Sequence, residues 1–301
     1  MDSSTNSLSF DLHTYRWPSQ NIENQQLRGV ILIFMGFGSH IQRYSLVAKI
    51  FNESGYDVVG FDYKNFGKSA QDPKFKGFIE DIEKFYNEGY QFLQVVRDYY
   101  NHRDDLTQNQ KDTLTYIAFG FSLGGQLAVG VQQLSVKNST PGFDALILNA
   151  PNFTMKFREP LEIVQKQLLD FMNGDISTPM SKDYNQFSEF GDKGMFKFYQ
   201  DDDLVIRSAT YCQTLLLNSE PSQQYKDGFK FINVPVYLAL ARNDSVVDNE
   251  ESRKFMQSII TGESFKQCKE YDCEHPLLYN ENVYEQLVND EIQWLESIIN
   301  F

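Results

Sequence analysis

From about residue 29 onward, short apolar runs alternate with amphipathic segments, and this alternation constrains the fold more than any other feature of the sequence. Apolar runs this short and β-branched fit strands buried on both faces better than helices. Between them, apolar residues recur three and four positions apart, as on one face of a helix. The order predicts an α/β fold, a mostly parallel sheet flanked by helices. The expected strands are 30–34, 56–61, 114–119, 145–148, 234–240 and 265–271, and the expected helices are 41–52, 78–99, one ending near 134, 250–260 and 282–299.

Residues 151–233 interrupt this alternation of strands and helices between two late strands, and they are interpreted as an inserted helical cap. The core is then expected to comprise residues 1–150 and 234–301. Within the insertion, residues 160–172 carry an apolar stripe typical of an amphipathic helix. The acidic run Asp201–Asp203 is interpreted as a solvated turn or helix start without a catalytic role.

The charge and cysteine content exclude several functional classes. A net charge of −14 over 301 residues disfavours nucleic acid as a partner and limits membrane contact to the periphery. The polar N-terminus shows no secretory signal, and no apolar run approaches the roughly 20 residues of a membrane helix. Cys212, Cys268 and Cys273 form no CxxC motif, which favours a reducing compartment, with the cytoplasm as the expected location. Without HExxH, a complete GxGxxG or a P-loop, no metal and no cofactor is expected.

A Gly-x-Ser-x-Gly motif spans Gly120 to Gly124, between an expected strand and an expected helix. Small residues are needed two positions before and after Ser122 because a side chain there would clash in the sharp turn. The turn presents the serine hydroxyl at a helix N-terminus, where the helix dipole favours a developing oxyanion. The pattern is typical of a nucleophile elbow, although a glycine-rich packing loop would give the same spacing.

A serine nucleophile needs a histidine base and an orienting carboxylate. Among the four histidines, only His275 follows an expected strand on the C-terminal side of the elbow. His13 lies in an expected early hairpin, His40 lies before the elbow, and His102 lies in an expected polar loop. After the fifth expected strand, Asp244 is favoured over Asp248, which has the position of a helix N-cap. The order Ser122, Asp244, His275 is that of α/β-hydrolases.

Two backbone N–H groups are expected to stabilise the oxyanion. The first belongs to Leu123, directly after the proposed nucleophile. The second is expected from the turn 35–38, which follows the first buried strand, with Phe37 as the natural donor.

The chain resembles the monoglyceride lipase, lysophospholipase and serine aminopeptidase branch of the α/β-hydrolases over most of its length. Residues 36–44, GFGSHIQRY, are similar to the branch's loop HGxGEHxxRY, and residues 62–69, DYKNFGKS, to its DxxGHGxS. The resemblance implies that Phe37 and Leu123 are the oxyanion donors and that residues 199–218 belong to a cap over an acyl-binding pocket. The residues expected to bind substrate are Met35, Gly36, Phe121, Leu161, Val164 and Leu168.

The sequence departs from this pattern at two places: Met35 replaces the histidine before the oxyanion glycine, and Asn65 and Phe66 replace a Gly-His pair. The leading hypothesis is a serine hydrolase that cleaves carboxylic esters, of monoacylglycerol or lysophospholipid type, through an acyl-enzyme on Ser122. The alternative is an inactive hydrolase fold that serves as a subunit of a larger assembly, because fold does not fix function. The choice among esters, thioesters and amides stays open.

Overall fold

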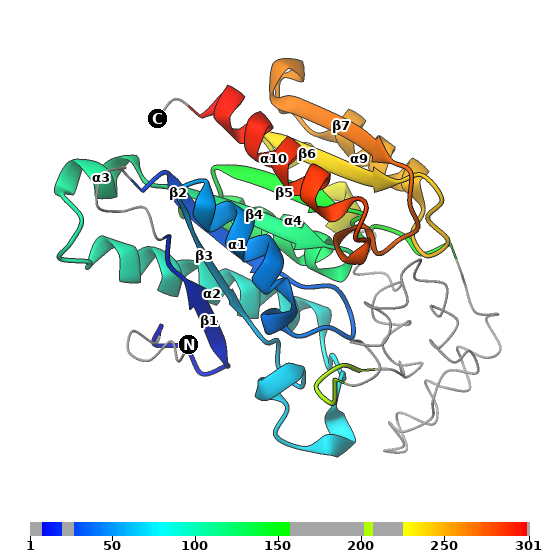
Figure 1. Ribbon diagram of the computed structural model, residues 1–301, viewed down its shortest axis with the longest axis horizontal. Coiled ribbons are helices and arrows are strands. Elements are labelled where there is room, and N and C mark those ends of the chain that lie inside the picture. Colours follow the sequence, from blue (N-terminus) through cyan, green and yellow to red (C-terminus); the bar gives the residue numbers. More distant parts are fainter. Residues whose placement is uncertain (1–7, 20–26, 157–201, 207–224, 300–301) are drawn as a thin grey trace.

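The computed structural model describes residues 8–19, 27–156, 202–206 and 225–299. Its described strands form one twisted sheet in the order β1-β3-β2-β4-β5-β6-β7 (Figure 1). All neighbours in this sheet are parallel except β1, which pairs antiparallel with β3. The strands are β1 Thr14–Trp17, β2 Gly29–Phe34, β3 Tyr56–Phe61, β4 Thr115–Phe121, β5 Ala145–Asn149, β6 Val236–Ala241 and β7 Lys266–Tyr271.

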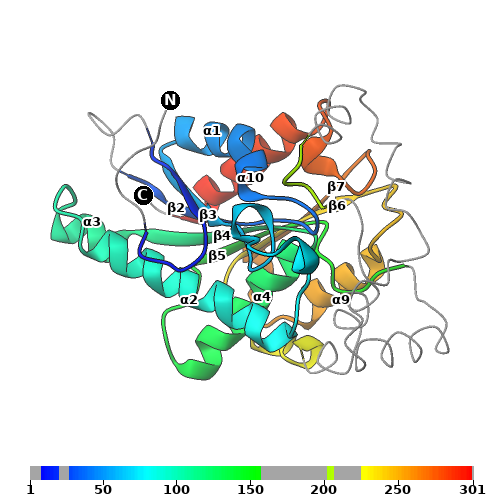
Figure 2. The same ribbon diagram turned by 90° about the horizontal axis from the view of Figure 1, so that it is seen from below.

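Helices cover both faces of the sheet. Figure 2 shows α1 and α10 on one face and α2, α4 and α9 on the other. The described α-helices are α1 Ser45–Glu53, α2 Ile82–Asn101, α3 Gln108–Thr113, α4 Leu123–Asn138, α9 Asn249–Ser258 and α10 Tyr284–Ile298. Short 3-10 turns lie at Ile41–Tyr44, Gly67–Ser69, Pro73–Phe75, Phe229–Phe231, Glu263–Phe265 and Leu277–Tyr279.

The α/β class and the six strands expected from the sequence are confirmed, with ends shifted by a few residues. The expectation of an early hairpin at His13 is wrong, because the strand that follows it, β1, lies at the edge of the sheet and pairs antiparallel with β3. Helix α2 begins later than expected, since Asp81 accepts the backbone N–H groups of Glu83 and Lys84 and so caps it. The expected polar loop contains α3, which starts at a capping box between Thr107 and Gln110.

Described parts of the interval 151–233 pack against helix α9. Phe153, Tyr225 and Phe229 form an aromatic cluster with Phe255 of α9, with ring centroids 4.7 to 6.3 Å apart. Both ends of the interval are therefore tied to the hydrophobic core. The expected helix 160–172, with Leu161, Val164 and Leu168, lies outside the described residues, and so does Cys212. The division into core and cap stays a prediction.

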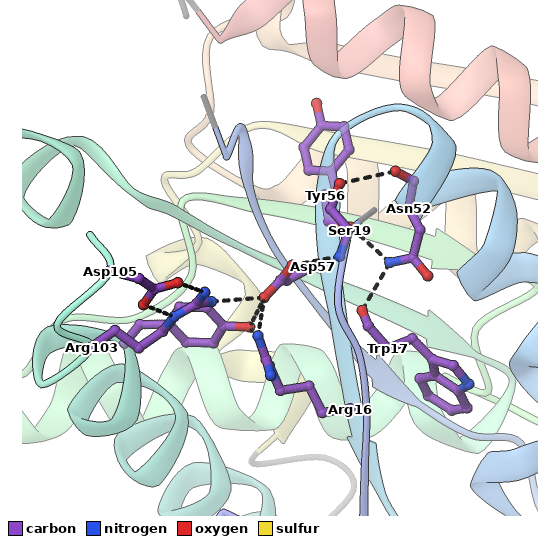
Figure 3. Close-up of polar contacts among 9 residues, drawn as sticks. Arg16, Trp17, Ser19, Asn52, Tyr56, Asp57, Arg103 and Asp105 are labelled. Atoms are coloured by element: carbon purple, nitrogen blue, oxygen red, sulfur yellow. Dashed lines mark hydrogen bonds and ion pairs between the residues drawn. The ribbon is translucent and has the colours of Figure 1, made fainter. Parts of the chain in front are cut away.

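A polar cluster lies at the amino end of β3, where Asp57 has no exposed surface (Figure 3). Its carboxylate accepts hydrogen bonds from Arg16 at 2.9 Å, Arg103 at 3.1 Å, the Tyr100 hydroxyl at 2.6 Å and the Ser19 backbone N–H at 2.7 Å. Arg103 also pairs with Asp105. The buried charge is thus fully compensated, as a charge in a protein interior must be.

The opposite end of the sheet gathers the candidate site. Strands β4, β6 and β7 run parallel, so the loops that follow them meet at one edge. Ser122, Asp244 and His275 lie in these three loops. In the described part of the chain, no helix is both long and apolar enough to cross a bilayer.

Candidate active site

Ser122 occupies a strained turn between β4 and α4, with φ 52° and ψ −115°. Its N–H donates to the Asn149 carbonyl at 2.9 Å, and its own carbonyl accepts the Asn152 N–H at 2.9 Å. The flanking glycines are sterically required: a Cβ on Gly120 would lie 2.5 Å from the Gly124 carbonyl oxygen, and one on Gly124 would lie 1.9 Å from that of Phe34. The surrounding backbone therefore holds the serine in a conformation that non-glycine residues rarely adopt.

The His275 imidazole joins Ser122 to Asp244. Its Nε2 lies 3.0 Å from Ser122 Oγ, and its Nδ1 lies 2.7 Å from Asp244 Oδ2. All three residues are buried, with exposed fractions of 8, 9 and 2% for Ser122, His275 and Asp244. The Phe121 ring packs on the imidazole, with centroids 5.3 Å apart. The arrangement gives a hydroxyl, a base and an orienting carboxylate in one hydrogen-bonded chain.

Asp244 is held from two sides. Its Oδ1 accepts the N–H groups of Val246 at 2.8 Å and Val247 at 2.9 Å, which leaves Oδ2 for His275. Burial disfavours the charged carboxylate, but the hydrogen bond and charge of His275 and these two N–H groups together lower the pKa of Asp244 below its ordinary value. Asp248, the other candidate carboxylate, accepts the Glu250 N–H and caps α9.

The loop after β2 is anchored by residues whose roles the sequence reasoning did not identify. The Gly36 N–H donates to the Tyr44 hydroxyl at 2.9 Å, and the Met35 carbonyl accepts the Tyr63 hydroxyl at 2.8 Å. Burial raises the pKa of both phenols well above their ordinary value, so both stay neutral. Tyr44 thus occupies the Gly36 N–H, and the next N–H along the loop is that of Phe37, the expected oxyanion donor.

Asp62 fixes the other end of the same loop. Its Oδ1 accepts the Ile41 N–H at 2.7 Å and its Oδ2 accepts the Lys68 N–H at 2.8 Å. One carboxylate thus ties the loop after β2 to the loop after β3. Tyr44 and Asp62 both lie in the two segments that resemble the hydrolase branch, and that resemblance was the available signal for them.

Tyr279 connects the histidine loop to the loop after β2. Its hydroxyl lies 3.0 Å from Ser39 Oγ, the Arg43 guanidinium lies 4.7 Å from its ring centroid, and its ring meets Phe121 edge-on at 5.9 Å. Nothing in the sequence pattern singled out this residue, because its partners are distant in the chain.

The departures from the family pattern are accommodated by local packing. Asn65 adopts φ 68°, which asparagine tolerates better than most residues, and its side chain donates to the Phe78 carbonyl at 2.8 Å. Phe66 is fully buried and meets the Phe37 ring edge-on, with centroids 5.7 Å apart. Met35 is also fully buried. An aromatic contact therefore supports the loop that carries the expected oxyanion donor.

The expected substrate-binding residues divide into two groups. Gly36 backs onto Phe121, since a Cβ there would lie 2.7 Å from that ring, and Met35 is fully buried. Leu161, Val164 and Leu168 fall outside the described residues. Leu123, the other expected oxyanion donor, is the first residue of α4, where backbone N–H groups have no partner within the helix.

In the described segments, no group of three or more histidine, cysteine, aspartate or glutamate side chains is arranged to hold a metal ion. Cys268 and Cys273 are free thiols.

Fold and site together define the class: an α/β-hydrolase with a serine at the elbow and a histidine and an aspartate in reach. The sequence profile of the serine aminopeptidase S33 family matches residues 25–282. The chain therefore belongs to this family and is a serine hydrolase.

Individual relatives are distant. A monoglyceride lipase of Saccharomyces cerevisiae is 23% identical over 295 residues, which cover 93% of this chain and 88% of that protein. The crystal structure of a Paleococcus ferrophilus monoacylglycerol lipase matches with a TM-score of 0.74 at 18% identity, over 96% of this chain and 99% of the other. A soluble variant of the Saccharomyces lipase in complex with a substrate analog matches with a TM-score of 0.74 at 17% identity, over 96% and 92%. These structural likenesses show the fold.

Proposed function

We propose that this chain hydrolyses carboxylic esters of fatty acyl chains, of monoacylglycerol or lysophospholipid type, through an acyl-enzyme on Ser122. The observation that carries the proposal is the chain of hydrogen bonds from Ser122 through His275 to Asp244, at 3.0 and 2.7 Å. The similarity to two monoacylglycerol lipases supports the acyl ester as substrate.

The first half of the reaction forms the acyl-enzyme. Ser122 Oγ attacks the ester carbonyl carbon while His275 Nε2 takes the hydroxyl proton, and the carbonyl electrons move to oxygen. The resulting oxyanion accepts hydrogen bonds from the N–H groups of Phe37 and Leu123. Its collapse breaks the bond to the alcohol, which leaves with the proton from His275.

The second half releases the acid. Water attacks the acyl carbon, His275 takes one of its protons, and the second tetrahedral intermediate expels Ser122 Oγ, which recovers that proton from His275. Throughout, Asp244 accepts the Nδ1–H of His275, so that Nε2 faces the serine in the form that can take a proton. The carboxylate also stabilises the imidazolium that exists in each transition state.

Labelling with a fluorophosphonate probe tests the nucleophile. The wild-type chain and Ser135→Ala should label, whereas Ser122→Ala should not. Ser135 is a matched control because it lies on α4, the helix that Ser122 precedes, and its hydroxyl bonds to the Val131 carbonyl of the same helix. Folded wild-type protein that takes up no label would contradict the proposal and favour the alternative of a hydrolase-fold subunit without activity.

A substrate panel tests the acyl ester. It comprises monoacylglycerols, lysophosphatidylcholine, p-nitrophenyl esters of graded chain length and amino acid p-nitroanilides. We expect kcat/KM to be highest for a long-chain ester. Preferential cleavage of the anilides would instead assign the chain to aminopeptidase chemistry, which the family name also covers.

A further inference from the structure

A short segment of the insertion, residues 202–206, lies on the loop that carries Phe37. The Ile206 N–H donates to the Gly38 carbonyl at 2.8 Å, and the side chains of Val205 and Ile206 are buried. On its other side, Lys76 Nζ donates to the Asp203 carbonyl. Figure 1 shows the segment in yellow-green beside the cyan loop that contains Lys76.

The segment is joined to the loop by a pair of side chains. His40 Nε2 lies 2.6 Å from Asp202 Oδ2, and the exposed fractions of the two side chains are 6 and 16%. Asp202 Oδ1 accepts the Leu204 N–H at 3.0 Å, which orients the carboxylate. Burial works against the charge of Asp202, but the hydrogen bonds from His40 and Leu204 lower its pKa. The interpretation of Asp201–Asp203 as a merely solvated turn is therefore wrong for Asp202.

The pair acts on residues 37–40 of the loop, where Ser39 Oγ also meets the Tyr279 hydroxyl and the Phe37 ring also meets Phe66. The start of the loop is held by Tyr63 and Tyr44, and Ile41 is held by Asp62. Between these anchors lie residues 37–40, which include Gly38 with φ 78°. Such a glycine can move readily between conformations, so the direction of the neighbouring N–H depends on what holds the loop.

We propose that Asp202 and His40 are positioning residues, which hold the loop so that the Phe37 N–H points at the reacting carbonyl oxygen. This inference rests on the proposed function, because it assigns the Phe37 N–H to the oxyanion. The pair touches neither the nucleophile nor the base. It acts through backbone geometry, to which an oxyanion hole is sensitive, since a donor must lie within hydrogen-bonding distance of the transition state.

Asp202→Asn and Asp202→Ala test the inference, with Asp203→Ala as the matched control. Asp203 is the neighbouring acid, and its described contact uses the backbone carbonyl, which the substitution keeps. We expect Asp202→Ala to lower kcat about tenfold, the scale of one charge-assisted hydrogen bond, with KM changed less than about twofold. Asp202→Asn should retain more activity, because the amide oxygen can still accept one hydrogen bond.

Two further measurements separate positioning from simple destabilisation. Affinity for a trifluoromethyl ketone, whose hemiketal oxygen mimics the oxyanion, should fall by the same factor as kcat. The double variant His40→Ala/Asp202→Ala should lose no more than the larger single loss, because the two residues act as one unit. Thermal unfolding shows whether each variant is folded.

These experiments can show the positioning role to be wrong without affecting the proposed hydrolase function. If Ser122→Ala abolishes turnover but Asp202→Ala matches the wild type, or changes KM alone, the positioning role is wrong and the hydrolase stands. Losses that multiply in the double variant would also contradict it. Absence of turnover in the wild type would remove both proposals.

Discussion

Two buried aspartates lie at opposite ends of the sheet, and their partners differ in kind. Asp57, at the amino end of β3, is held by two arginines, a tyrosine and a backbone N–H (Figure 3). Asp244, after the carboxyl end of β6, is held by two backbone N–H groups and a histidine. Both carboxylates are nearly inaccessible to water, with exposed fractions of 0 and 2%.

The difference shows how one residue type serves two purposes. An arginine stays protonated at any physiological pH, so the two arginines at Asp57 do not exchange a proton with it, and we expect this cluster to act on stability. An imidazole can take up and release a proton, and in the proposed mechanism the pair at Asp244 takes the proton of Ser122 and returns it. Both aspartates are buried, so we expect their different roles to follow from their partners: arginines at Asp57 and a histidine at Asp244.

Asp244→Asn gives the largest expected effect. The Asn side chain can keep its oxygen on the N–H groups of Val246 and Val247, but its amide N–H₂ then faces His275 Nδ1. This favours the tautomer with the proton on Nε2, which cannot accept the serine proton. We expect kcat to fall about 10,000-fold with little change in stability.

Asp248→Asn is the matched control for Asp244→Asn, because asparagine caps a helix as well as aspartate does. Steady-state kinetics with a p-nitrophenyl ester and unfolding in urea measure both variants. A loss of activity in Asp248→Asn as large as in Asp244→Asn would mean that the loop, and not the hydrogen bond to His275, is responsible.

Asp57→Asn should have the opposite effect to Asp244→Asn: a loss of stability without a loss of kcat. Removing this charge leaves Arg16 and Arg103, whose side chains are 16 and 9% exposed, with a neutral partner. We expect the free energy of unfolding to fall by about 3 kcal/mol, the lower end for a broken buried pair, because Arg103 keeps Asp105. The kcat of the folded enzyme should not change.

Urea unfolding and active-site titration with the fluorophosphonate separate the two effects of Asp57→Asn. Asp98→Asn is its control, since the pair of Asp98 with His102 is exposed and contributes at most a few tenths of a kcal/mol. A lowered kcat per labelled site in Asp57→Asn would contradict the assignment of this cluster to stability alone.

Sequence reasoning was strongest where a feature is local. The elbow glycines and the buried strands carry their own signals, because close packing and burial constrain each residue type at its own position. The chain order then left few choices for the other two site residues, and the structure brings Ser122, Asp244 and His275 together. The second candidate carboxylate, Asp248, had the position of an N-cap and is one.

Interactions between distant segments could not be predicted in this way. His40 and Asp202 are 162 positions apart, and neither shows a pattern that points to the other. Asp57 lies in an apolar run with the pattern of an ordinary strand, while its arginine partners come from β1 and from the loop just after α2. Short β1, partly exposed throughout, has no hydrophobic alternation to specify its partner.

A third buried acid, Glu291 of α10, differs from both aspartates because its described neighbours include no cation. Burial raises the pKa of Glu291 well above its ordinary value; Asn149 opposes the rise in part, and the charge of Asp290 adds to it by a smaller amount. The folded protein therefore binds a proton that the unfolded chain has lost at neutral pH. Stability should be fully retained below the unfolded pKa and should decrease as the pH rises toward the folded one.

Glu291→Gln removes this titration. Variant and wild type should unfold at similar urea concentrations near pH 4.5, the ordinary range for glutamate, and the variant should be the more stable at pH 8. The difference should reach about 1.4 kcal/mol for each tenfold rise in proton affinity on folding. Glu285→Gln, on the exposed face of the same helix, should show no such growth with pH. A variant that stays less stable than the wild type at pH 8 would mean that Glu291 is charged and paired, like Asp57, rather than neutral.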